Sequence, residues 1–293
     1  MRYGAIDIGT NAARLLVGEV VEEDGHSFIK KVSYTRIPLR LGEEVFSTGE
    51  ISEKKKTEFV KTIQAFRLIS EIFEVVELRA CATSAMREAT NGLLVRDLIE
   101  VETGVSIETI SGDEEAELIL GTFALFDLDI EVPFVVIDVG GGSTEISVFE
   151  NGERIASKSF EVGTLRIIKE KVNPNVWADM TEWLKTNIEL SKHHIVYGTG
   201  GNINKAQKLV GAMQADPISL KKLEDLRDGL SPLTIAQRVD RFQLKPDRAE
   251  VLVPAMEIFS HIMRALKCRT ILVPKIGLSD GIIYQLDQKN KNS

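Results

Sequence analysis

The sequence is poor in the residues that mark several protein classes. Only two of its 293 residues are cysteine, Cys81 and Cys268, and no CxxC or Cys/His cluster has the spacing of a zinc site. No apolar run approaches the roughly 18 residues that a membrane span requires. The N-terminus lacks the charged and apolar regions of a leader peptide. We therefore expect buried thiols in a reducing compartment, a cytoplasmic location and no membrane partner.

Positive charge is not in excess either. The 36 Lys and Arg residues are outnumbered by 44 Asp and Glu residues, which gives a net charge of −8. This balance argues against nonspecific binding to nucleic acid, although a local basic pocket on an acidic protein can still bind an anionic substrate. Hydrophobic residues make up 43% and charged residues 27%, as in folded soluble proteins. The length suits two domains.

Strand-like and helix-like segments alternate along the first part of the chain, which predicts an α/β fold. Strands are predicted at 3–8, 13–21, 26–38, 75–82 and 105–110. Helices are predicted at 52–73, 86–102 and 112–126, the second of them interrupted at Asn91-Gly92. Beyond Pro133 the pattern starts again with a buried strand at 134–139 and a returning strand at 144–149. Helices are then predicted at 164–172, 175–191 and 202–212, and a last short strand at 271–274.

One internal similarity indicates two related domains. Residues 6–20 read IDIGTNAARLLVGEV and residues 137–151 read IDVGGGSTEISVFEN. Both segments contain Ile-Asp-x-Gly, a small polar turn and then an alternating strand, so Asp7 corresponds to Asp138 and Gly9 to Gly140. We expect each domain to begin with the same hairpin.

A strand that ends in Asp and is followed by Gly and small polar residues suits a phosphate group. Glycines let backbone N–H groups approach an oxyanion, and hydroxyl, amide and guanidinium groups add donors. The Asp side chain can hold a hydrated Mg²⁺, as Asp7 and Asp138 would here. Two ordinary hairpins with glycine turns are the alternative. The candidate phosphate-binding residues are Gly9, Thr10, Asn11 and Arg14 in the first hairpin and Gly140, Gly141, Gly142 and Ser143 in the second.

A second anion site is predicted where Gly198-Thr-Gly-Gly-Asn202 follows a strand and opens a helix. Its candidate residues are Gly200, Gly201 and Asn202, and a plain strand-to-helix turn is the alternative. The P-loop, the dinucleotide-binding turn, the nucleophile elbow and HExxH are all absent from the sequence.

The acidic run Ser111-Gly-Asp-Glu-Glu115 supplies a candidate catalytic base. Ser111 and Glu114 fit a capping box at a helix start. Glu115 then points about 100° away from Glu114 around the helix and could activate a water molecule. A solvated acidic first turn is the alternative. Arg87, after the strand at 75–82, could either reach a cleft or cover a helix face.

Together these residues resemble the exopolyphosphatase/guanosine pentaphosphate phosphohydrolase (Ppx/GppA) family of the actin/hexokinase/Hsp70 superfamily. The similarity covers nearly the whole chain. It rests on six separated motifs: DIGTNAARL (7–15), ATSAMREATN (82–91), ISGDEEAELI (110–119), VIDVGGGSTEI (136–146), GTGGN (198–202) and GLSDGI (277–282).

The resemblance implies two actin-like (ribonuclease H-like) domains, 1–125 and 126–279, with an active-site cleft between them and a C-terminal helix, about 280–293, packed on the first. It implies release of terminal orthophosphate from inorganic polyphosphate, or of the 5′ γ-phosphate from guanosine pentaphosphate, with Mg²⁺ or Mn²⁺. It makes Glu115 the catalytic glutamate and Arg87 the cleft arginine. It makes Asp7, Asp138 and Glu145 the metal and phosphate residues. We also expect a homodimer.

The sequence departs from the family pattern at Ala12, where Ser is usual, at Asn202, where Thr is common, and at Ser279, where Arg is common. Loss of the donor at Ala12 would weaken or redirect binding of a long chain. The sequence stops near residue 293, so we expect no C-terminal HD-type domain and low processivity. Two other functions stay open: a nucleotide-using kinase of the same superfamily, and a non-catalytic sensor of polyphosphate or alarmone nucleotides.

Overall fold

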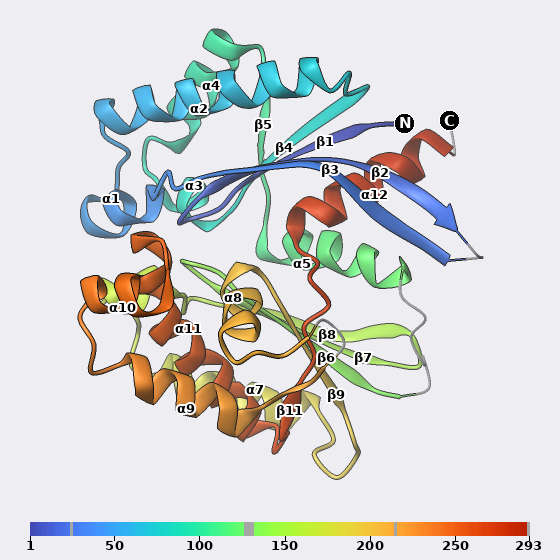
Figure 1. Cartoon of the computed structure of the whole chain (residues 1–293), viewed down its shortest axis with the longest axis vertical. Helices are drawn as coiled ribbons and strands as arrows, with labels where there is room; N and C mark the ends of the chain where they lie inside the picture. The colour runs from blue at the N-terminus through green and yellow to red at the C-terminus, as the bar shows by residue number, and fades with distance from the viewer. Residues whose placement is uncertain (24–25, 126–131, 214–215, 292–293) are drawn as a thin grey trace. The chain divides into compact units, whose positions relative to one another are not determined.

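The chain divides into two compact units in the computed structural model (Figure 1). Unit 1 comprises Met1–Leu128 and Ile276–Ser293, and unit 2 comprises Asp129–Lys275. The structure describes residues 1–23, 26–125, 132–213 and 216–291. The domain boundary was expected between residues 125 and 126, and residue 125 is the last described residue before the gap at 126–131. Among the described residues, no helix has the length and apolar character to cross a membrane.

Unit 1 is built on a five-stranded mixed sheet in the order β3-β2-β1-β4-β5. β1, β2 and β3 form antiparallel pairs, whereas β4 and β5 run parallel to β1. The strands are β1 (Tyr3–Ile8), β2 (Ala13–Glu23), β3 (His26–Ile37), β4 (Glu77–Ala82) and β5 (Ile107–Thr109). The helices are α1 (Leu41–Thr48), α2 (Glu53–Ile72), α3 (Ser84–Glu88), α4 (Gly92–Thr103), α5 (Gly112–Gly121), the 3₁₀ helix η1 (Thr122–Leu125) and α12 (Leu278–Lys291).

The last helix of the chain belongs to unit 1. In Figure 1, α12 (red) lies beside β1, β2 and α5, and its apolar face, including Ile282 and Ile283, is fully buried. Lys31 on β3 lies 2.7 Å from the Asp280 carboxylate at the start of the helix. Near its end, Lys289 donates to Glu77 on β4 at 2.9 Å. Unit 1 is therefore closed by a segment that is distant from the rest of it in sequence.

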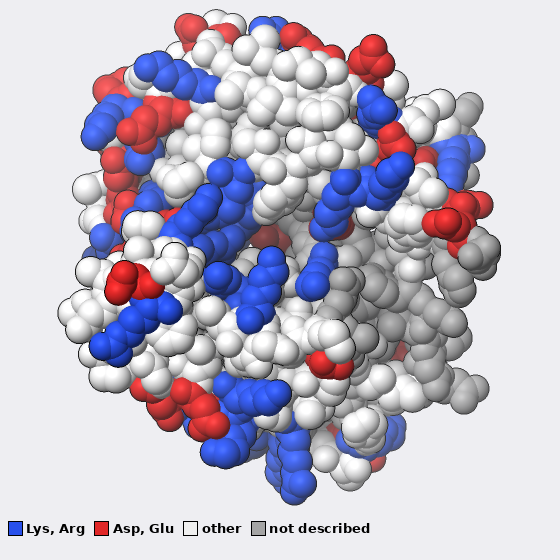
Figure 2. Space-filling view, viewed as in Figure 1, with Lys and Arg blue, Asp and Glu red and all other residues white. Residues whose placement is uncertain are grey.

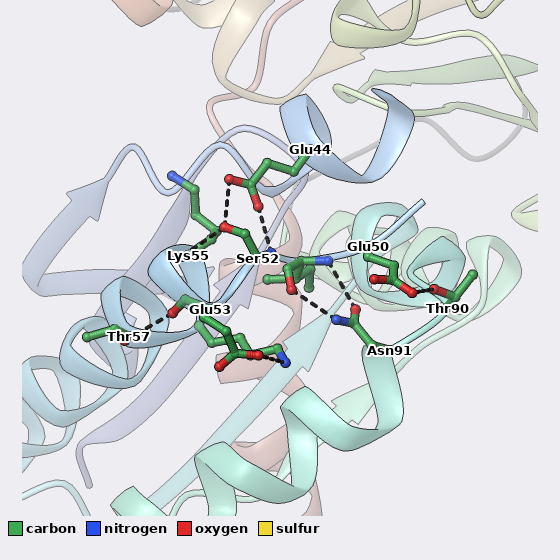
Figure 3. A network of polar contacts seen from close by, with 10 residues as sticks. Glu44, Glu50, Ser52, Glu53, Lys55, Thr57, Thr90 and Asn91 are labelled. Atoms are coloured by element: carbon green, nitrogen blue, oxygen red, sulfur yellow. Dashed lines mark hydrogen bonds and ion pairs between the residues drawn. The ribbon is translucent and has the colours of Figure 1, made fainter. Parts of the chain in front are cut away.

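A polar network fixes the corner where α1, α2 and α4 meet (Figure 3). Ser52 caps the N-terminus of α2, since its side chain accepts from Lys55 N. The Glu44 carboxylate on α1 accepts from Ser52 N at 2.8 Å and from Ser52 Oγ at 3.0 Å. The Asn91 amide, at the start of α4, bonds both backbone groups of Ile51. The network holds α1 against the N-terminus of α2.

Unit 2 repeats the same strand arrangement with a four-stranded sheet in the order β8-β7-β6-β9. Its strands are β6 (Phe134–Val139), β7 (Thr144–Glu150), β8 (Glu153–Phe160) and β9 (Ile195–Thr199), with a separate pair of β10 (Ile218–Ser219) and β11 (Thr270–Ile271). Its helices are α6 (Thr164–Ile168), α7 (Val176–Asn187), α8 (Gly201–Leu209), α9 (Leu220–Leu230), α10 (Ile235–Phe242) and α11 (Pro246–Ala265). α11 contributes Leu252, Met256 and Phe259 to the core.

The two predicted hairpins have the same geometry, and the α/β fold is confirmed. In unit 1, Gly9 N donates to Ala12 O at 3.1 Å, and in unit 2, Gly140 N donates to Ser143 O at 3.0 Å. β1 and β6 each pair with a returning antiparallel strand on one side and a parallel strand on the other. The sequence repeat therefore corresponds to a repeat in structure.

Several element predictions were wrong. The interruption predicted in the helix at 86–102 is confirmed, but it lies at residues 89–91, between α3 and α4, and α3 begins earlier than predicted, at Ser84. α1 was not predicted: it begins after Arg40, which has a left-handed conformation and makes no side-chain cap. β8 was missed because most of its exposed and half-buried positions carry polar residues, and its apolar Ile155 is itself exposed. α6, α7 and β11 are shorter than predicted, and the predicted helix end at residue 126 lies outside the described residues.

Candidate active site

The first glycine loop, Gly9–Ala12, is held by backbone hydrogen bonds to α1. Gly42 N donates to Thr10 O and Arg40 N donates to Asn11 O, both at 3.0 Å. The loop carbonyls are therefore turned toward the helix. Ala12 is fully buried. Because Gly9 N bonds Ala12 O, the amides that the loop could present to an anion are those of Thr10, Asn11 and Ala12.

Asp7 and Arg14 are paired with each other in the hairpin that carries this loop. They are directly opposite in the β1–β2 register, and Arg14 Nη1 lies 2.5 Å from Asp7 Oδ2. The Asp7 side chain is 8% exposed and that of Arg14 is 22% exposed. The predicted metal ligand of unit 1 thus lies in an ion pair with the predicted phosphate-binding arginine.

The motif at 82–91 meets the first loop at the carboxyl end of β4. Thr83 N donates to Ile8 O at 3.1 Å, and the hydroxyls of Ser84 and Thr10 lie 2.8 Å apart in a buried pair. Thr83, at the N-cap position of α3, makes no side-chain cap. Ser84 instead orients the Thr10 side chain.

Arg87 and Glu115 are placed at the same end of the sheet. Arg87 is exposed, and its Nη1 donates to Ile110 O at 2.6 Å, just before α5 begins. Ile110 N in turn donates to Ala82 O at 3.0 Å. Glu115 is half-buried in the first turn of α5. Unit 1 therefore gathers Asp7, Thr10, Ser84, Arg87 and Glu115 where β1, β4 and β5 end.

The predicted capping box at α5 is present only in part. Ser111 Oγ accepts from Glu114 N at 3.1 Å, as expected for the cap. The Glu114 carboxylate lies 3.2 Å from Arg79 Nη2 on β4 instead of closing the box. Glu114 thus has a structural partner, as predicted, but a different one.

In unit 2, the second glycine loop is held by α6 as the first is by α1. Leu165 N donates to Gly141 O at 2.8 Å, and Thr164 N donates to Gly140 O at 3.0 Å. The buried Arg166 side chain donates through Nε to Gly142 O at 2.8 Å. All three glycine carbonyls therefore face α6. Because Gly140 N bonds Ser143 O, the amides that could bind a ligand are those of Gly141, Gly142 and Ser143.

Asp138 and Glu145 form a pair of neighbouring acidic residues. They are directly opposite in the β6–β7 register, where unit 1 has Asp7 and Arg14. Thr199 Oγ1 donates to Asp138 Oδ2 at 2.5 Å, and Ser159 Oγ donates to Glu145 Oε1 at 2.8 Å. Two carboxylates with hydroxyl neighbours fit a hard, partly hydrated cation such as Mg²⁺. Among the described residues there is no cluster of three or more His, Cys, Asp and Glu that could hold a metal ion.

The predicted anion site at the start of α8 lies next to this acidic pair. Gly200 has a φ of +90°, which favours glycine, and a Cβ there would stand 3.1 Å from Asp138 Oδ1. Asn202 Nδ2 donates to Val139 O at 3.3 Å, at the end of β6. The structure therefore brings Asp138, Glu145, Gly200 and Asn202 together within unit 2.

Sequence reasoning missed Arg248 on α11. Its Nη1 donates to Asn202 Oδ1 at 3.3 Å, and a Cβ on Gly201 would stand 2.7 Å from its Nη2. A guanidinium at a helix N-terminus strengthens an anion site. Arg248 is distant from the glycines in sequence and follows Pro246 in an ordinary helix start, so no local signal marked it.

Cys81 lies opposite Asp7 in the β1–β4 register. Burial raises the pKa of its thiol to about 12, so the group is protonated near neutral pH. A covalent cysteine mechanism is therefore disfavoured, and carboxylates remain the candidate bases.

A model of the Ppx/GppA phosphatase family matches residues 19–290. The chain belongs to this family. Exopolyphosphatase 1 of Mycobacterium tuberculosis, a curated relative, is 27% identical over 97% of this chain and 88% of its own length. The bifunctional 3-dehydroquinate synthase/phosphatase of Fusobacterium nucleatum is 28% identical over 88% of this chain and 42% of its own length.

Solved structures of Ppx/GppA proteins have the same fold. An exopolyphosphatase from Cytophaga hutchinsonii superposes with a TM-score of 0.82 at 23% identity, covering 99% of this chain and 98% of that one. The Aquifex aeolicus family member gives a TM-score of 0.77 at 22% identity over 100% and 99% of the two chains. At these identities the comparison establishes the two-domain actin-like fold.

Proposed function

We propose that this Ppx/GppA chain is a phosphohydrolase that releases orthophosphate from the end of inorganic polyphosphate. The observation that carries the proposal is the duplicated glycine loop, Gly9–Ala12 and Gly140–Ser143, in which α1 and α6 engage the carbonyls. Two such loops suit a substrate with several phosphates. Curated relatives named exopolyphosphatase support this substrate class.

The charge distribution is compatible with a polyanionic substrate. Residues 129–275, which form unit 2, contain 20 Lys and Arg and 19 Asp and Glu. The remaining residues, which form unit 1, contain 16 Lys and Arg and 25 Asp and Glu. The net negative charge of the chain therefore belongs to unit 1. Figure 2 shows Lys and Arg side chains grouped on the surface in spite of the acidic total. Unit 2, with Arg248 and Asn202 at the start of α8, is the better candidate to bind the phosphate chain.

Glu115 is the proposed general base. Its carboxylate would orient and deprotonate the attacking water, and the N–H groups of Arg87 would stabilise charge on the transferred phosphoryl group. The water oxygen would bond to the terminal phosphorus as the bridging P–O bond to the next phosphate breaks. One water proton would pass to Glu115, and the shortened polyphosphate, which keeps the bridging oxygen, would be the leaving group. The glycine loops and Arg248 would hold the remaining phosphates.

Asp138 and Glu145 are the proposed holders of Mg²⁺ or Mn²⁺, which would neutralise phosphate charge when bound. Asp7, also predicted as a ligand, lies against Arg14 and would chiefly orient that guanidinium. Arg14 would then bind phosphate beside Gly9.

The test is orthophosphate release with Mg²⁺ from short polyphosphate, long polyphosphate and guanosine pentaphosphate. We expect release from polyphosphate that EDTA abolishes. Glu115→Gln should lower the rate about 10²- to 10⁴-fold while the protein still folds and binds substrate. Asp113→Asn, an exposed acid in the same turn, is the matched control and should keep the rate. A fully active Glu115→Gln enzyme would remove Glu115 from the mechanism.

The same assay separates the other candidate functions. Release from guanosine pentaphosphate alone would make that nucleotide the substrate. Tight binding of either substrate with no release would favour a sensor, and ADP formation with an acceptor would favour a kinase. The predicted homodimer is tested by light scattering of the purified chain.

A further inference from the structure

Glu115 can act as a base only if its carboxylate is held in one direction. Glu115 lies in the first turn of α5, and two contacts reach the residue before the helix cap. Ile110 N donates to Ala82 O at 3.0 Å, and Arg87 Nη1 donates to Ile110 O at 2.6 Å. Both contacts fix where the chain enters α5. Neither of them fixes the rotation of the first turn about the helix axis.

Arg79 on β4 makes a side-chain contact with that turn. Its guanidinium, on a side chain 15% exposed, donates through Nη2 to Glu114 Oε1 at 3.2 Å. It also donates to the Glu108 carboxylate on β5, from Nε at 3.0 Å and from Nη2 at 2.7 Å, and Nη1 contacts Gln285 on α12. One planar group therefore connects β4, β5, α5 and α12.

The other half of α5 is fixed by close backbone packing. A Cβ on Gly281 would stand 2.0 Å from Leu118 O, so α12 approaches α5 as closely as only glycine permits. The Tyr284 ring packs over Gly121 one turn further along. The Arg79–Glu114 contact connects the first turn of α5 to β4, at the opposite end of the helix from this packing.

We propose that Arg79 is a positioning residue for hydrolysis: by holding Glu114 it fixes the first turn of α5, and with it the direction of the Glu115 carboxylate. This inference rests on the proposed role of Glu115. A positioning role for Arg79 also gives the adjacent residues Glu114 and Glu115 different roles. Arg79 neutralises Glu114 and keeps it from competing with Glu115 for the attacking water.

Steady-state kinetics of orthophosphate release from short polyphosphate tests the proposal. Arg79→Met keeps an unbranched apolar stem and removes the guanidinium and its donors. We expect its kcat to fall about tenfold to a hundredfold, because a displacement near 1 Å costs up to about 10² in rate. KM should stay within about twofold, as for an interaction used only in the transition state. Arg79→Lys should recover part of kcat. Glu108→Ala, which removes the other partner of the same guanidinium, should keep kcat.

A double-mutant cycle separates positioning from general damage. Glu114→Ala should lower kcat as Arg79→Met does, and the double variant should be no slower than the slower single variant. Losses that multiply, or an Arg79→Met enzyme as fast as wild type, would overturn the proposal.

Hydrogen exchange gives a readout that does not need activity. Amides 114–118 should exchange faster in Arg79→Met and Glu114→Ala than in Glu108→Ala, with the rest of unit 1 unchanged. Unchanged exchange in Arg79→Met would refute the contact as a clamp. If the wild-type chain releases no orthophosphate, the proposed function fails, and the exchange result still decides whether Arg79 holds α5.

Discussion

At the scale of single residues, the two hairpins differ at one equivalent position. The residue opposite the strand-end aspartate is Arg14 in unit 1 and Glu145 in unit 2. An arginine neutralises its aspartate, whereas a second carboxylate creates a demand for a cation. The sequence repeat had grouped Asp7 with Asp138, and the cross-strand register shows that the residues opposite them differ in the sign of their charge.

This difference predicts unequal effects of the two aspartates on metal dependence. Asp138→Asn should raise the Mg²⁺ concentration for half-maximal activity about tenfold or more, since it removes a proposed ligand. Asp7→Asn, the matched variant in the other hairpin, should leave that concentration unchanged and raise KM, since Arg14 loses its partner. The measurement is orthophosphate release across a Mg²⁺ titration. An equal rise of the half-maximal Mg²⁺ concentration in both variants would show that Asp7 is also a metal ligand.

His261 gives a second prediction at this scale, in unit 2. Its Nε2 lies 3.1 Å from Trp177 O, and burial lowers its pKa below the ordinary 6.5. The unfolded chain therefore binds a proton more readily than the folded one, so stability is retained above about pH 6.5 and is lost as the pH falls through the folded pKa.

The chain's two tryptophans, Trp177 and Trp183, both lie in unit 2, so urea unfolding followed by their fluorescence reports this unit. Between pH 7.5 and 5.5 the wild type should lose more stability than His261→Gln. The same pH dependence in both proteins would show that His261 is not the titrating group.

The residues that the sequence identified are those next to glycines or helix caps. Local signals of this kind located Glu115 and the loops at Gly9 and Gly140. Arg79, Arg166 and Arg248 were missed, because each meets its loop or helix only through tertiary packing. An arginine in an otherwise ordinary strand or helix carries no local mark of such a contact.

At the scale of elements, the position of each glycine loop depends on the helix whose N–H groups bond its carbonyls. α1 holds the Gly9–Ala12 loop, and the network around Ser52 and Asn91 holds α1 (Figure 3). The helix and strand predictions were best where apolar periodicity was strong, as in α2 and β6. α1 was not predicted because it begins after a residue in the left-handed conformation. β8 was not predicted because most of its positions are polar and show no apolar periodicity.

Asn91 is therefore expected to stabilise unit 1 and to hold α1, and with it the Gly9–Ala12 loop, in place. Asn91→Ala removes the bonds to Ile51 N at 3.0 Å and to Ile51 O at 2.9 Å, and should cost about 1–3 kcal/mol. Thr57→Ala, which removes an exposed hydroxyl bond within α2, is the control and should change stability by no more than about 0.5 kcal/mol. Urea unfolding followed by far-ultraviolet circular dichroism measures both. Equal stability of the two variants would show that the α1 corner does not depend on Asn91.

At the scale of the whole molecule, the chain enters unit 1, completes unit 2 and returns to unit 1 with α12. The apolar face of α12 (Leu278, Ile282, Ile283 and Leu286) is buried in unit 1. At about 1.5–3 kcal/mol for each buried side chain, this face contributes as much as the whole stability of a typical domain. Unit 1 therefore cannot be completed until the last residues are present.

Deleting residues 276–293 should consequently unfold unit 1 and leave unit 2 folded. β1 and β4 should lose their protection from hydrogen exchange, because α12 covers β1 and holds β4 through Glu77. The tryptophan fluorescence of unit 2 should still show a cooperative transition in urea, because all of Asp129–Lys275 remains. A variant with Ile283→Ala alone is the graded control and should weaken protection by about 2–5 kcal/mol without abolishing it. Full protection of β1 in the truncated chain would show that unit 1 is stable without its last helix, and loss of the fluorescence transition would show that unit 2 depends on it.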